Sequence, residues 1–329
     1  MKAIVFTEYG PPDVLQYREI DKPEPAESEV LVKVSASSVN AYDWHMLRAD
    51  PFLVRLMNGL FKPRIQILGA DIAGVVEAVG CEVTRFKAGD QVYGDISALG
   101  GGFAEYVCAD ESFLAFKPAS LSFAESASLP MASVTALQGL RDHGKIKSGQ
   151  KVAINGASGG VGSCAIQIAK AFDGEVTAIC STRNMETARD LGADHVIDYT
   201  REDFTKSGNK YDLIFAVNGN SSIFDYRRAL TPGGRFVQSG GSMKQVYQAM
   251  ILGPILSKKN GRKMKNYIAR PNSKDLEFIA ELVQNGNLKP VIDKKYELDE
   301  VPEAIRFLED GHARGKIVIT IADRFKENL

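Results

Sequence analysis

The sequence predicts an α/β protein of two domains, and three observations lead to this prediction. The chain has 329 residues, roughly twice the ~150 residues of a typical domain. Its first ~120 residues are rich in β-branched residues and are broken by glycine and proline, as expected of short strands joined by turns. From about residue 122 onwards, strand patterns alternate with helical patterns, which is typical of βαβ units and a parallel sheet.

Short apolar segments predict the strands of the first domain, and turn-forming residues separate them. Because little helical patterning accompanies these segments, we expect a small, barrel-like antiparallel domain. Residues 47–65 differ, since their apolar side chains do not alternate, and they predict either a helical turn or a mobile lid. The expected strands lie at 2–6, 29–39, 72–79, 91–93 and 103–108.

The second domain begins with helical signals. Ser122 and Glu125 form a capping box that predicts the start of a short helix, and Pro130 begins a second helical run to about Arg141. Residues 161–172 have their apolar side chains on one stripe at helical spacing. The expected strands are 151–155, 175–180, 211–217 and 235–240, and the expected helices are 161–172, 185–191, 223–230 and 243–256.

The end of the chain predicts two amphipathic helices and a closing strand. The helices are expected at 276–283 and 301–308, and the strand at 316–321. These elements follow the alternating region, and we therefore expect the second domain to be inserted into the first.

The composition excludes several classes of protein. Hydrophobic residues make up 44% of the chain and charged residues 25%, as in ordinary soluble globular proteins. The 40 Lys and Arg residues balance 41 Asp and Glu residues, which argues against a nucleic-acid-binding protein. We find neither a signal peptide nor an apolar stretch of the ~20 residues needed to span a membrane. The four cysteines lack C-x-x-C spacing, so we expect a reducing compartment, and specifically the cytoplasm.

The most informative motif is a glycine loop between an expected strand and an expected helix. Gly156, Gly159 and Gly162 follow the strand with G-x-x-G-x-x-G spacing. Glycines allow a tight turn and a close approach of a pyrophosphate, whose charge the helix N-terminus then faces. This order of strand, glycine turn and helix predicts a dinucleotide-binding site. The alternative is a glycine-rich turn that binds nothing.

The end of the next strand indicates NADPH as the dinucleotide. A carboxylate ~20 residues beyond the loop would hold the ribose 2′-hydroxyl of NAD, and this strand end has none. Ser181 and Thr182 instead offer hydroxyls, and Arg183 offers a charge that can pair with the 2′-phosphate of NADPH. The alternative for Arg183 is a solvated surface arginine.

Further motifs occur along the whole chain. They are MKAIVFTEYGPPDVL at 1–15, SVNAYD at 38–43, LGADIAGV at 68–75, FKAGDQV at 86–92, GGFAEY at 101–106, LGADHVIDY at 191–199 and GHARGK at 311–316. With the glycine loop, they resemble the medium-chain dehydrogenase/reductase superfamily in its zinc-free quinone oxidoreductase branch. The last motif is most similar to the reticulon-interacting and chloroplast-envelope oxidoreductases. The resemblance implies a GroES-like β-barrel catalytic domain of residues 1–123 and 266–329, with an inserted Rossmann NADPH-binding domain of residues 124–265.

The resemblance also implies roles for individual residues. Asn40 and Tyr42 match positions beside the nicotinamide and the substrate, and the Tyr42 hydroxyl could donate a proton or a hydrogen bond to the substrate oxygen. The alternative for Tyr42 is an aromatic side chain without a proton role. Thr135 matches a residue on the nicotinamide side, with a plain helix-face hydroxyl as its alternative, and Tyr199 matches one near the 2′-phosphate. The other implied cofactor contacts are Ser158, Gly160 and Val161 with the pyrophosphate, Gly240 with the nicotinamide ribose, and His312 and Arg314.

The chain departs from the zinc-dependent members of that superfamily. Those members have Cys at position 40, a His-Glu pair at 70–71 and Cys near 131, whereas this chain has Asn40, Ala70, Asp71 and Met131. A catalytic zinc needs about three protein ligands, so we expect no metal.

Zinc stabilises an alkoxide in those relatives, and without it the chemistry that remains is hydride transfer to substrates that are already electrophilic. The sequence therefore predicts an NADPH-dependent reductase of quinones or α,β-unsaturated carbonyls. The alternatives are a zinc-free reductase of another carbonyl class and an NADPH-binding structural or regulatory protein with little turnover. We expect a small-molecule substrate as partner, and the resemblance implies a homodimer.

Overall fold

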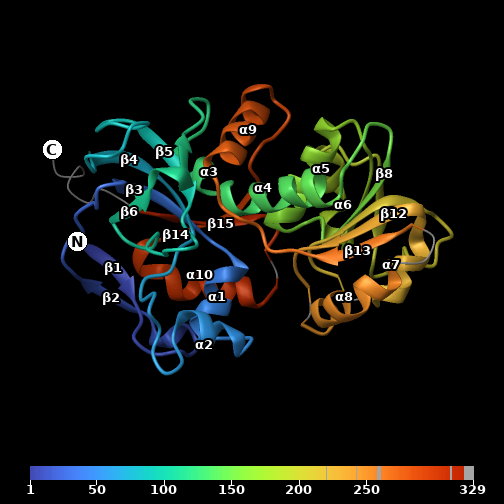
Figure 1. Ribbon diagram of the computed structural model, residues 1–329, viewed down its shortest axis with the longest axis horizontal. Helices are drawn as coiled ribbons and strands as arrows, with labels where there is room; N and C mark the ends of the chain where they lie inside the picture. The colour runs from blue at the N-terminus through green and yellow to red at the C-terminus, as the bar shows by residue number, and fades with distance from the viewer. Residues whose placement is uncertain (220, 242, 258–260, 312, 322–329) are drawn as a thin grey trace. The chain divides into compact units, whose positions relative to one another are not determined.

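The computed structural model describes residues 1–219, 221–241, 243–257, 261–311 and 313–321, which form two compact units (Figure 1). Unit 1 comprises Met1–Met131, Pro271–Gln284 and Pro290–Leu329, and unit 2 comprises Ala132–Arg270 and Asn285–Lys289. Unit 2 is thus built mainly from one continuous insertion into the chain of unit 1. The predicted α/β class, with a β-rich unit and a parallel-sheet unit, is confirmed.

Unit 1 is built on a seven-stranded sheet whose long strand β3 (Glu29–Val39) pairs with three neighbours. Val30, Val32 and Val34 of β3 are buried in the main hydrophobic core of the unit. All pairings in this sheet are antiparallel except that of β14 with β15. The order is β14-β15-β3-β4-β5-β7, with β6 also paired to β3. The other strands are β4 (Asp71–Val79), β5 (Gln91–Asp95), β6 (Tyr106–Asp110), β7 (Leu114–Phe116), β14 (Ile292–Glu297) and β15 (Lys316–Thr320), beside a separate pair β1 (Lys2–Val5) and β2 (Gln16–Glu19).

The helices of unit 1 are short and lie around this sheet. Helix α1 (Ala41–Arg48) begins two residues after β3 ends, and α2 (Leu53–Asn58) follows it. Residues 47–65 therefore contain a short helix, in agreement with the helical alternative. The capping box of Ser122 and Glu125 does begin α3 (Phe123–Ala127). Helices α9 (Ser273–Gln284) and α10 (Val301–Glu309) are the two amphipathic helices expected near the end of the chain.

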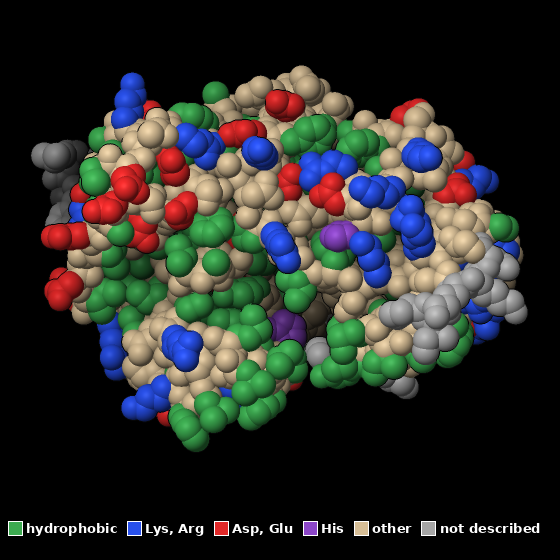
Figure 2. All heavy atoms as spheres, in the orientation of Figure 1, with side chains coloured by type: hydrophobic (Ala, Val, Ile, Leu, Met, Phe, Trp, Pro, Cys, Tyr) green, Lys and Arg blue, Asp and Glu red, His purple; other side chains and the backbone are tan. Residues whose placement is uncertain are grey.

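The segment around α2 exposes a large apolar surface. Polar contacts hold its backbone in place, since Tyr9 Oη donates to the Gly59 carbonyl at 2.7 Å and the Ile65 amide donates to Asn58 Oδ1 at 2.9 Å. The apolar side chains meanwhile point into solvent, and Figure 2 shows them at the lower edge of the view. We call this the α2 patch; it consists of Phe52, Leu53, Leu56, Met57, Leu60 and Phe61, all exposed. Exposed apolar surfaces of this kind often mark binding sites.

Unit 2 is built on a six-stranded, fully parallel sheet of order β10-β9-β8-β11-β12-β13. In chain order this is 3-2-1-4-5-6, the order of a doubly wound dinucleotide-binding fold. The chain reverses direction across the sheet between β8 and β11, which is where such folds bind ligands. The strands are β8 (Lys151–Asn155), β9 (Glu175–Cys180), β10 (His195–Asp198), β11 (Tyr211–Ala216), β12 (Leu230–Gln238) and β13 (Lys263–Asn266).

Helices cover both faces of this sheet, and Figure 1 shows α5 on one side with α7 and α8 on the other. The helices are α4 (Pro130–Leu137), continued by a π-helical turn at Gln138–His143, then α5 (Gly160–Ala171), α6 (Met185–Asp190), α7 (Ile223–Ala229) and α8 (Met243–Leu256). Among the described residues, none of the helices has both the length and the apolar character needed to cross a membrane.

The main differences from the expected elements concern short strands. β2, β7, β13 and β14 were not expected, because segments such as QYRE and KMKN lack an apolar run. Their partners complete them, since a strand at the edge of a sheet needs only one buried face. The segment expected as a strand at 103–108 is paired as a strand only from Tyr106 onwards.

Candidate functional site

Unit 2 carries the glycine loop, and two of its glycines are required by the backbone itself. Gly156 follows β8 with φ +91°, and a Cβ at this position would lie 2.7 Å from the Asn218 nitrogen. A Cβ on Gly162 would lie 2.1 Å from the Gly156 carbonyl oxygen. The loop and the first turn of α5 therefore approach each other too closely for a side chain.

At Gly159, by contrast, the backbone leaves room for a side chain. A Cβ built on Gly159 meets no atom within 4 Å, and its φ of −78° is accessible to any residue. Gly159 is the N-cap of α5, and its first turn has no side-chain cap. Free backbone N–H groups and the helix dipole thus face an open cradle, which fits the pyrophosphate of a dinucleotide. Ser158, Gly160 and Val161 belong to the same turn.

The residues predicted to meet the 2′-phosphate gather at one edge of the sheet. Ser181, Thr182 and Arg183 follow directly after β9, and Tyr199 follows directly after β10. The Tyr199 amide donates to the Cys180 carbonyl at 3.1 Å, and the Tyr199 side chain is 60% exposed. Because β8, β9 and β10 are adjacent and parallel, these residues share an edge with the glycine loop.

Asp198 is a carboxylate at this edge that the sequence analysis missed. It is buried at the end of β10, and its side chain accepts hydrogen bonds from Thr182 Oγ1, from Thr200 Oγ1 at 2.7 Å and from the Thr200 amide at 2.9 Å. These hydrogen bonds, with that of Thr182 strongest, hold the pKa of Asp198 below its usual range. The Thr182 hydroxyl therefore already donates its proton to the Asp198 carboxylate. The residue lies in the motif at 191–199, but only the pairing of β10 with β9 brings it beside Thr182.

Two further predicted cofactor residues belong to unit 2. Gly240 comes shortly after β12, and a Cβ there would lie 2.2 Å from the Val217 carbonyl oxygen, so these two loops are in close contact. Thr135 lies on α4 and is 8% exposed, and its carbonyl accepts a hydrogen bond from Tyr267 Oη.

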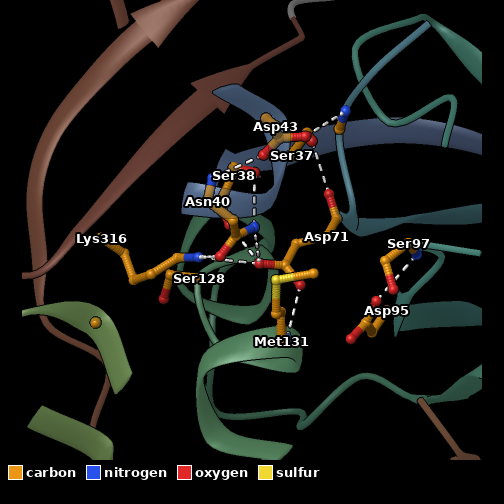
Figure 3. A network of polar contacts seen from close by, with 12 residues as sticks. Ser37, Ser38, Asn40, Asp43, Asp71, Asp95, Ser97, Ser128, Met131 and Lys316 are labelled. Carbon is orange, nitrogen blue, oxygen red and sulfur yellow. Dashed lines mark hydrogen bonds and ion pairs between the residues drawn. The ribbon is translucent and has the colours of Figure 1, made fainter. Parts of the chain in front are cut away.

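Unit 1 contains a buried row of polar residues at one end of its sheet. The register places Ile317 of β15 opposite Val39 of β3, Ser38 of β3 opposite Asp71 of β4, and Asp71 opposite Asp95 of β5. Lys316, Asn40, Asp71 and Asp95 therefore come together from positions far apart in the chain, and Figure 3 shows the first three pointing towards one another. Asp71 is fully buried, and Lys316 is 5% exposed.

The Asp71 carboxylate is the centre of this row. Its Oδ2 atom accepts from Ser38 Oγ at 2.7 Å, from Asn40 Nδ2 at 2.9 Å and from Lys316 Nζ at 3.0 Å. Its Oδ1 atom accepts from the Met131 amide at 2.7 Å. A buried carboxylate is tolerated when paired with a cation and surrounded by donors, and both conditions hold for Asp71.

Two other buried aspartates flank this centre. Asp43 on α1 accepts from the Asn40 amide at 2.7 Å and from the Gly69 amide at 2.9 Å, so it fixes the turn between β3 and α1. Burial raises the pKa of Asp43 to about 7, and the charge of Asp71 adds to the shift. Burial likewise raises the pKa of Asp95 to about 7, with Asp71 again adding and Lys316 opposing.

Tyr42 lies on α1, and its hydroxyl contacts a neighbouring loop. Its Oη donates to the Ser97 carbonyl at 2.6 Å, while the Ser97 amide donates to Asp95 Oδ1 at 3.0 Å. Burial and the nearby charges of Asp43 and Asp95 raise the pKa of Tyr42 above its usual range. The hydroxyl is thus a weaker acid than a free tyrosine, which favours the alternative without a proton role.

The two remaining predicted residues lie near the end of the chain. Arg314 is exposed in unit 1, and its amide donates to Asp293 Oδ2 at 2.8 Å. His312 lies outside the described residues.

The chemistry of the centre does not suit a catalytic zinc. Asn40, Ala70 and Met131 offer neither the thiolates nor the imidazole that zinc prefers, and the Lys316 ammonium lies within hydrogen-bond distance of Asp71. Within the described ranges, we find no group of three or more His, Cys, Asp or Glu residues arranged to hold a metal ion.

Two family descriptions match the chain. Residues 26–119 match the alcohol dehydrogenase GroES-like domain, and residues 191–319 match the family described as zinc-binding dehydrogenase. The first match lies in unit 1, and the second spans parts of both units.

Several curated proteins are similar over nearly the whole chain. The 2-methylene-furan-3-one reductase of Solanum lycopersicum is 37% identical, over 97% of this chain and 79% of the relative. The chloroplast envelope quinone oxidoreductase homolog of Arabidopsis thaliana is 33% identical, over 97% of this chain and 98% of the relative. The chloroplastic NADPH-dependent alkenal/one oxidoreductase of Arabidopsis thaliana is 33% identical, over 97% and 79%.

A solved structure has the same fold. The quinone oxidoreductase from Coxiella burnetii superimposes with a TM-score of 0.87 at 32% sequence identity, covering 98% of this chain and 99% of that protein.

Proposed function

The chain belongs to the medium-chain dehydrogenase/reductase superfamily, in its quinone oxidoreductase branch, and we propose that it is an NADPH-dependent reductase of quinones and α,β-unsaturated carbonyls. The glycine loop is the observation that carries this proposal, because its open cradle at Gly159 fits a dinucleotide pyrophosphate. The names of the relatives support the choice of cofactor and of substrate class.

We assign the residues of unit 2 to cofactor binding. The backbone of Gly156–Gly162 holds the pyrophosphate, and Ser181, Arg183 and Tyr199 offer groups for the adenosine 2′-phosphate. Arg183 supplies the positive charge for the phosphate. We do not assign Thr182 to the phosphate, because its hydroxyl already donates to Asp198. When bound, NADPH supplies the hydride, and the protein supplies position and electrostatics.

We assign Asn40 in unit 1 to substrate positioning. Its side-chain amide is buried and fixed by Asp71 and Lys316, and a fixed polar group orients a substrate at little entropic cost. For Tyr42, we propose a supporting role in holding the loop at Ser97, with solvent protonating the reduced product.

The α2 patch supports an apolar substrate. The patch lies on and around α2, and the preceding helix α1 carries Tyr42. Within the patch, Phe61 is 84% exposed and Met57 is 76% exposed. Apolar side chains of this kind favour a quinone or an alkenal over a charged substrate.

An assay of NADPH oxidation tests the proposal. We expect loss of the reduced-nicotinamide absorbance with a panel of quinones, enals and enones, and much slower loss with simple saturated aldehydes. Tight NADPH binding without turnover on the whole panel would instead favour a binding or regulatory protein.

We further propose that this activity is independent of zinc. The residues at positions 40, 70 and 131 support this, because Asn, Ala and Met are poor zinc ligands. Elemental analysis of the purified protein should give much less than one zinc per chain, and activity should persist after treatment with a chelator.

We also propose a cytoplasmic homodimer. The compartment is supported by four free thiols, at Cys81, Cys108, Cys164 and Cys180. The dimer is supported by the outer edge of β13, which has no strand partner among the described residues, so that a second copy could pair with it. Cell fractionation tests the cytoplasmic location against an organelle, since the names of two of the relatives mention the chloroplast. Light scattering that gives the mass of a monomer would contradict the dimer.

A further inference from the structure

Lys316 is the cation of the buried row, and neither the motifs nor the comparisons assign it a role. It is the first residue of β15, an otherwise apolar strand that reads KIVIT, and it is 5% exposed. Lysine is almost never this buried unless its charge is paired. Its Nζ donates to Asn40 Oδ1 and, at 3.0 Å, to Asp71 Oδ2.

These contacts determine the orientation of the Asn40 side-chain amide. Asn40 Oδ1 faces the ammonium, while Asn40 Nδ2 donates to Asp71 Oδ2 at 2.9 Å and to the Ser38 carbonyl at 3.3 Å. A flipped amide would turn its NH2 group towards a cation and its oxygen towards a carboxylate. Both ends of the amide therefore depend on the Lys316–Asp71 pair, because like-signed groups repel strongly where water is excluded.

Lys316 is also the cation that faces the buried aspartates. Asp71 Oδ2 lies 3.0 Å from Lys316 Nζ. The charge of Lys316 also lowers the pKa values of Asp43 and Asp95 and so opposes the increase caused by burial. Without that charge, three carboxyl groups would share a buried region with no cation among the contacts described. We therefore expect the contacts of Asp71 and Asn40 to rearrange when Lys316 is replaced by a neutral side chain.

We propose that Lys316 is a positioning residue for the reaction, whose buried ammonium binds both Asp71 and Asn40 and thereby fixes the Asn40 amide for the substrate. The ammonium contacts the side chains at positions 40 and 71, two of the positions at which the sequence departs from the zinc-dependent members. An internal, covalently attached cation thus organises the centre. This inference rests on the proposed function, since it is there that Asn40 positions the substrate.

The test compares Lys316→Met, which removes the charge and keeps the length, with Lys295→Met on the neighbouring strand β14, where the lysine is exposed. We expect Lys316→Met to lower kcat at least tenfold while the Kd for NADPH stays within twofold, and Lys295→Met to change neither. The side-chain amide resonances of Asn40, assigned with an Asn40→Asp variant, should shift in Lys316→Met and stay in place in Lys295→Met.

A second variant keeps the test decisive if Lys316→Met does not fold. Lys316→Ala leaves a gap of the length of propylammonium, so added propylammonium should restore part of kcat and the Asn40 resonances, and 1-propanol should not. Equal restoration by both compounds would mean that only volume matters. A folded Lys316→Met protein that keeps kcat within twofold, or keeps the Asn40 resonances unchanged, would also overturn the proposal. If the wild-type protein turns over no substrate, the proposed function fails, and the resonances alone decide the role of Lys316.

Discussion

At the scale of single residues, a hydroxyl that already donates its proton within the protein is a poor candidate for proton transfer to a substrate. Tyr42 illustrates this, because its hydroxyl proton is donated to the Ser97 carbonyl. A general acid that is essential contributes about 10²- to 10⁴-fold to a rate. We predict that Tyr42→Phe changes kcat by less than about threefold, measured at saturating NADPH and quinone, which is far below the loss of a general acid. A hundredfold loss with unchanged thermal stability would restore Tyr42 as the proton donor.

In our proposal, Arg183 is the residue on which the choice between NADPH and NADH depends. A charge-assisted hydrogen bond to a phosphate contributes roughly 1.5–3 kcal/mol. We therefore predict that Arg183→Ala raises the Kd for NADPH by about tenfold or more and leaves that for NADH nearly unchanged, as measured by fluorescence titration. Arg18→Ala, an exposed arginine of unit 1 that bonds Gln16, serves as the control. Equal losses for both cofactors would contradict a 2′-phosphate contact.

Asp95 makes stability depend on pH with a defined sign. Its pKa is about 7 in the folded protein, against 3.8 for an unperturbed aspartate, so the folded state holds its proton more tightly. The stabilisation is complete below pH 3.8 and is lost as the pH rises towards 7. Asp95→Asn keeps an acceptor for the Ser97 amide, and we predict that it reduces this slope by at most about 1.4 kcal/mol per pH unit, while the contribution of Asp43 remains. Urea unfolding at several pH values between the two pKa values measures it, and an unchanged slope would rule Asp95 out.

At the scale of elements, the strand-loop-helix unit of β8 and α5 contains glycines with different roles: one is required by close packing, and another leaves space for a ligand. Gly162 leaves no room for a Cβ, whereas Gly159 leaves an open cradle. We predict that Gly159→Ala keeps the melting temperature within about 2 °C, since no contact changes, and weakens NADPH binding by about tenfold or more, since the methyl group enters the pyrophosphate space. Gly162→Ala should lower the melting temperature as well.

Calorimetry and NADPH titration of the two variants, side by side, separate these effects. If Gly159→Ala bound NADPH as tightly as the wild type, the cradle would not be the pyrophosphate site.

The same unit shows what sequence reasoning can reach. The glycine loop was predictable because strand, turn and helix are consecutive in the chain, so their signals are local. The buried row in unit 1 was not, since Lys316, Asn40 and Asp71 meet only through the register of β15, β3 and β4. Asp198 was missed for a similar reason, because β10 is short and its pairing with β9 brings the carboxylate to Thr182. The resemblance pointed to Asn40 and to position 71, whereas the signal for Lys316 was a lysine that begins an apolar strand.

At the scale of the whole molecule, the chain connectivity links the stabilities of the two units. Unit 2 interrupts unit 1 with about 140 residues between Ala132 and Arg270. If unit 2 unfolded alone, unit 1 would have to close a disordered loop of that length, at a cost of about 4 kcal/mol. That cost is a large part of the 5–15 kcal/mol by which a typical protein is stable. We therefore expect unit 1 to unfold with unit 2.

This coupling makes the response to NADPH a property of the whole chain. In our proposal the glycine loop of folded unit 2 holds the cofactor, and at a hundred times its Kd the cofactor adds about 2.7 kcal/mol of stability. We predict a single calorimetric transition that moves to higher temperature as a whole when NADPH is added. The emission of Trp44 in unit 1 should report the same shifted midpoint as far-ultraviolet circular dichroism. Two transitions, with only one shifted by NADPH, would show that unit 1 survives the unfolding of its insertion.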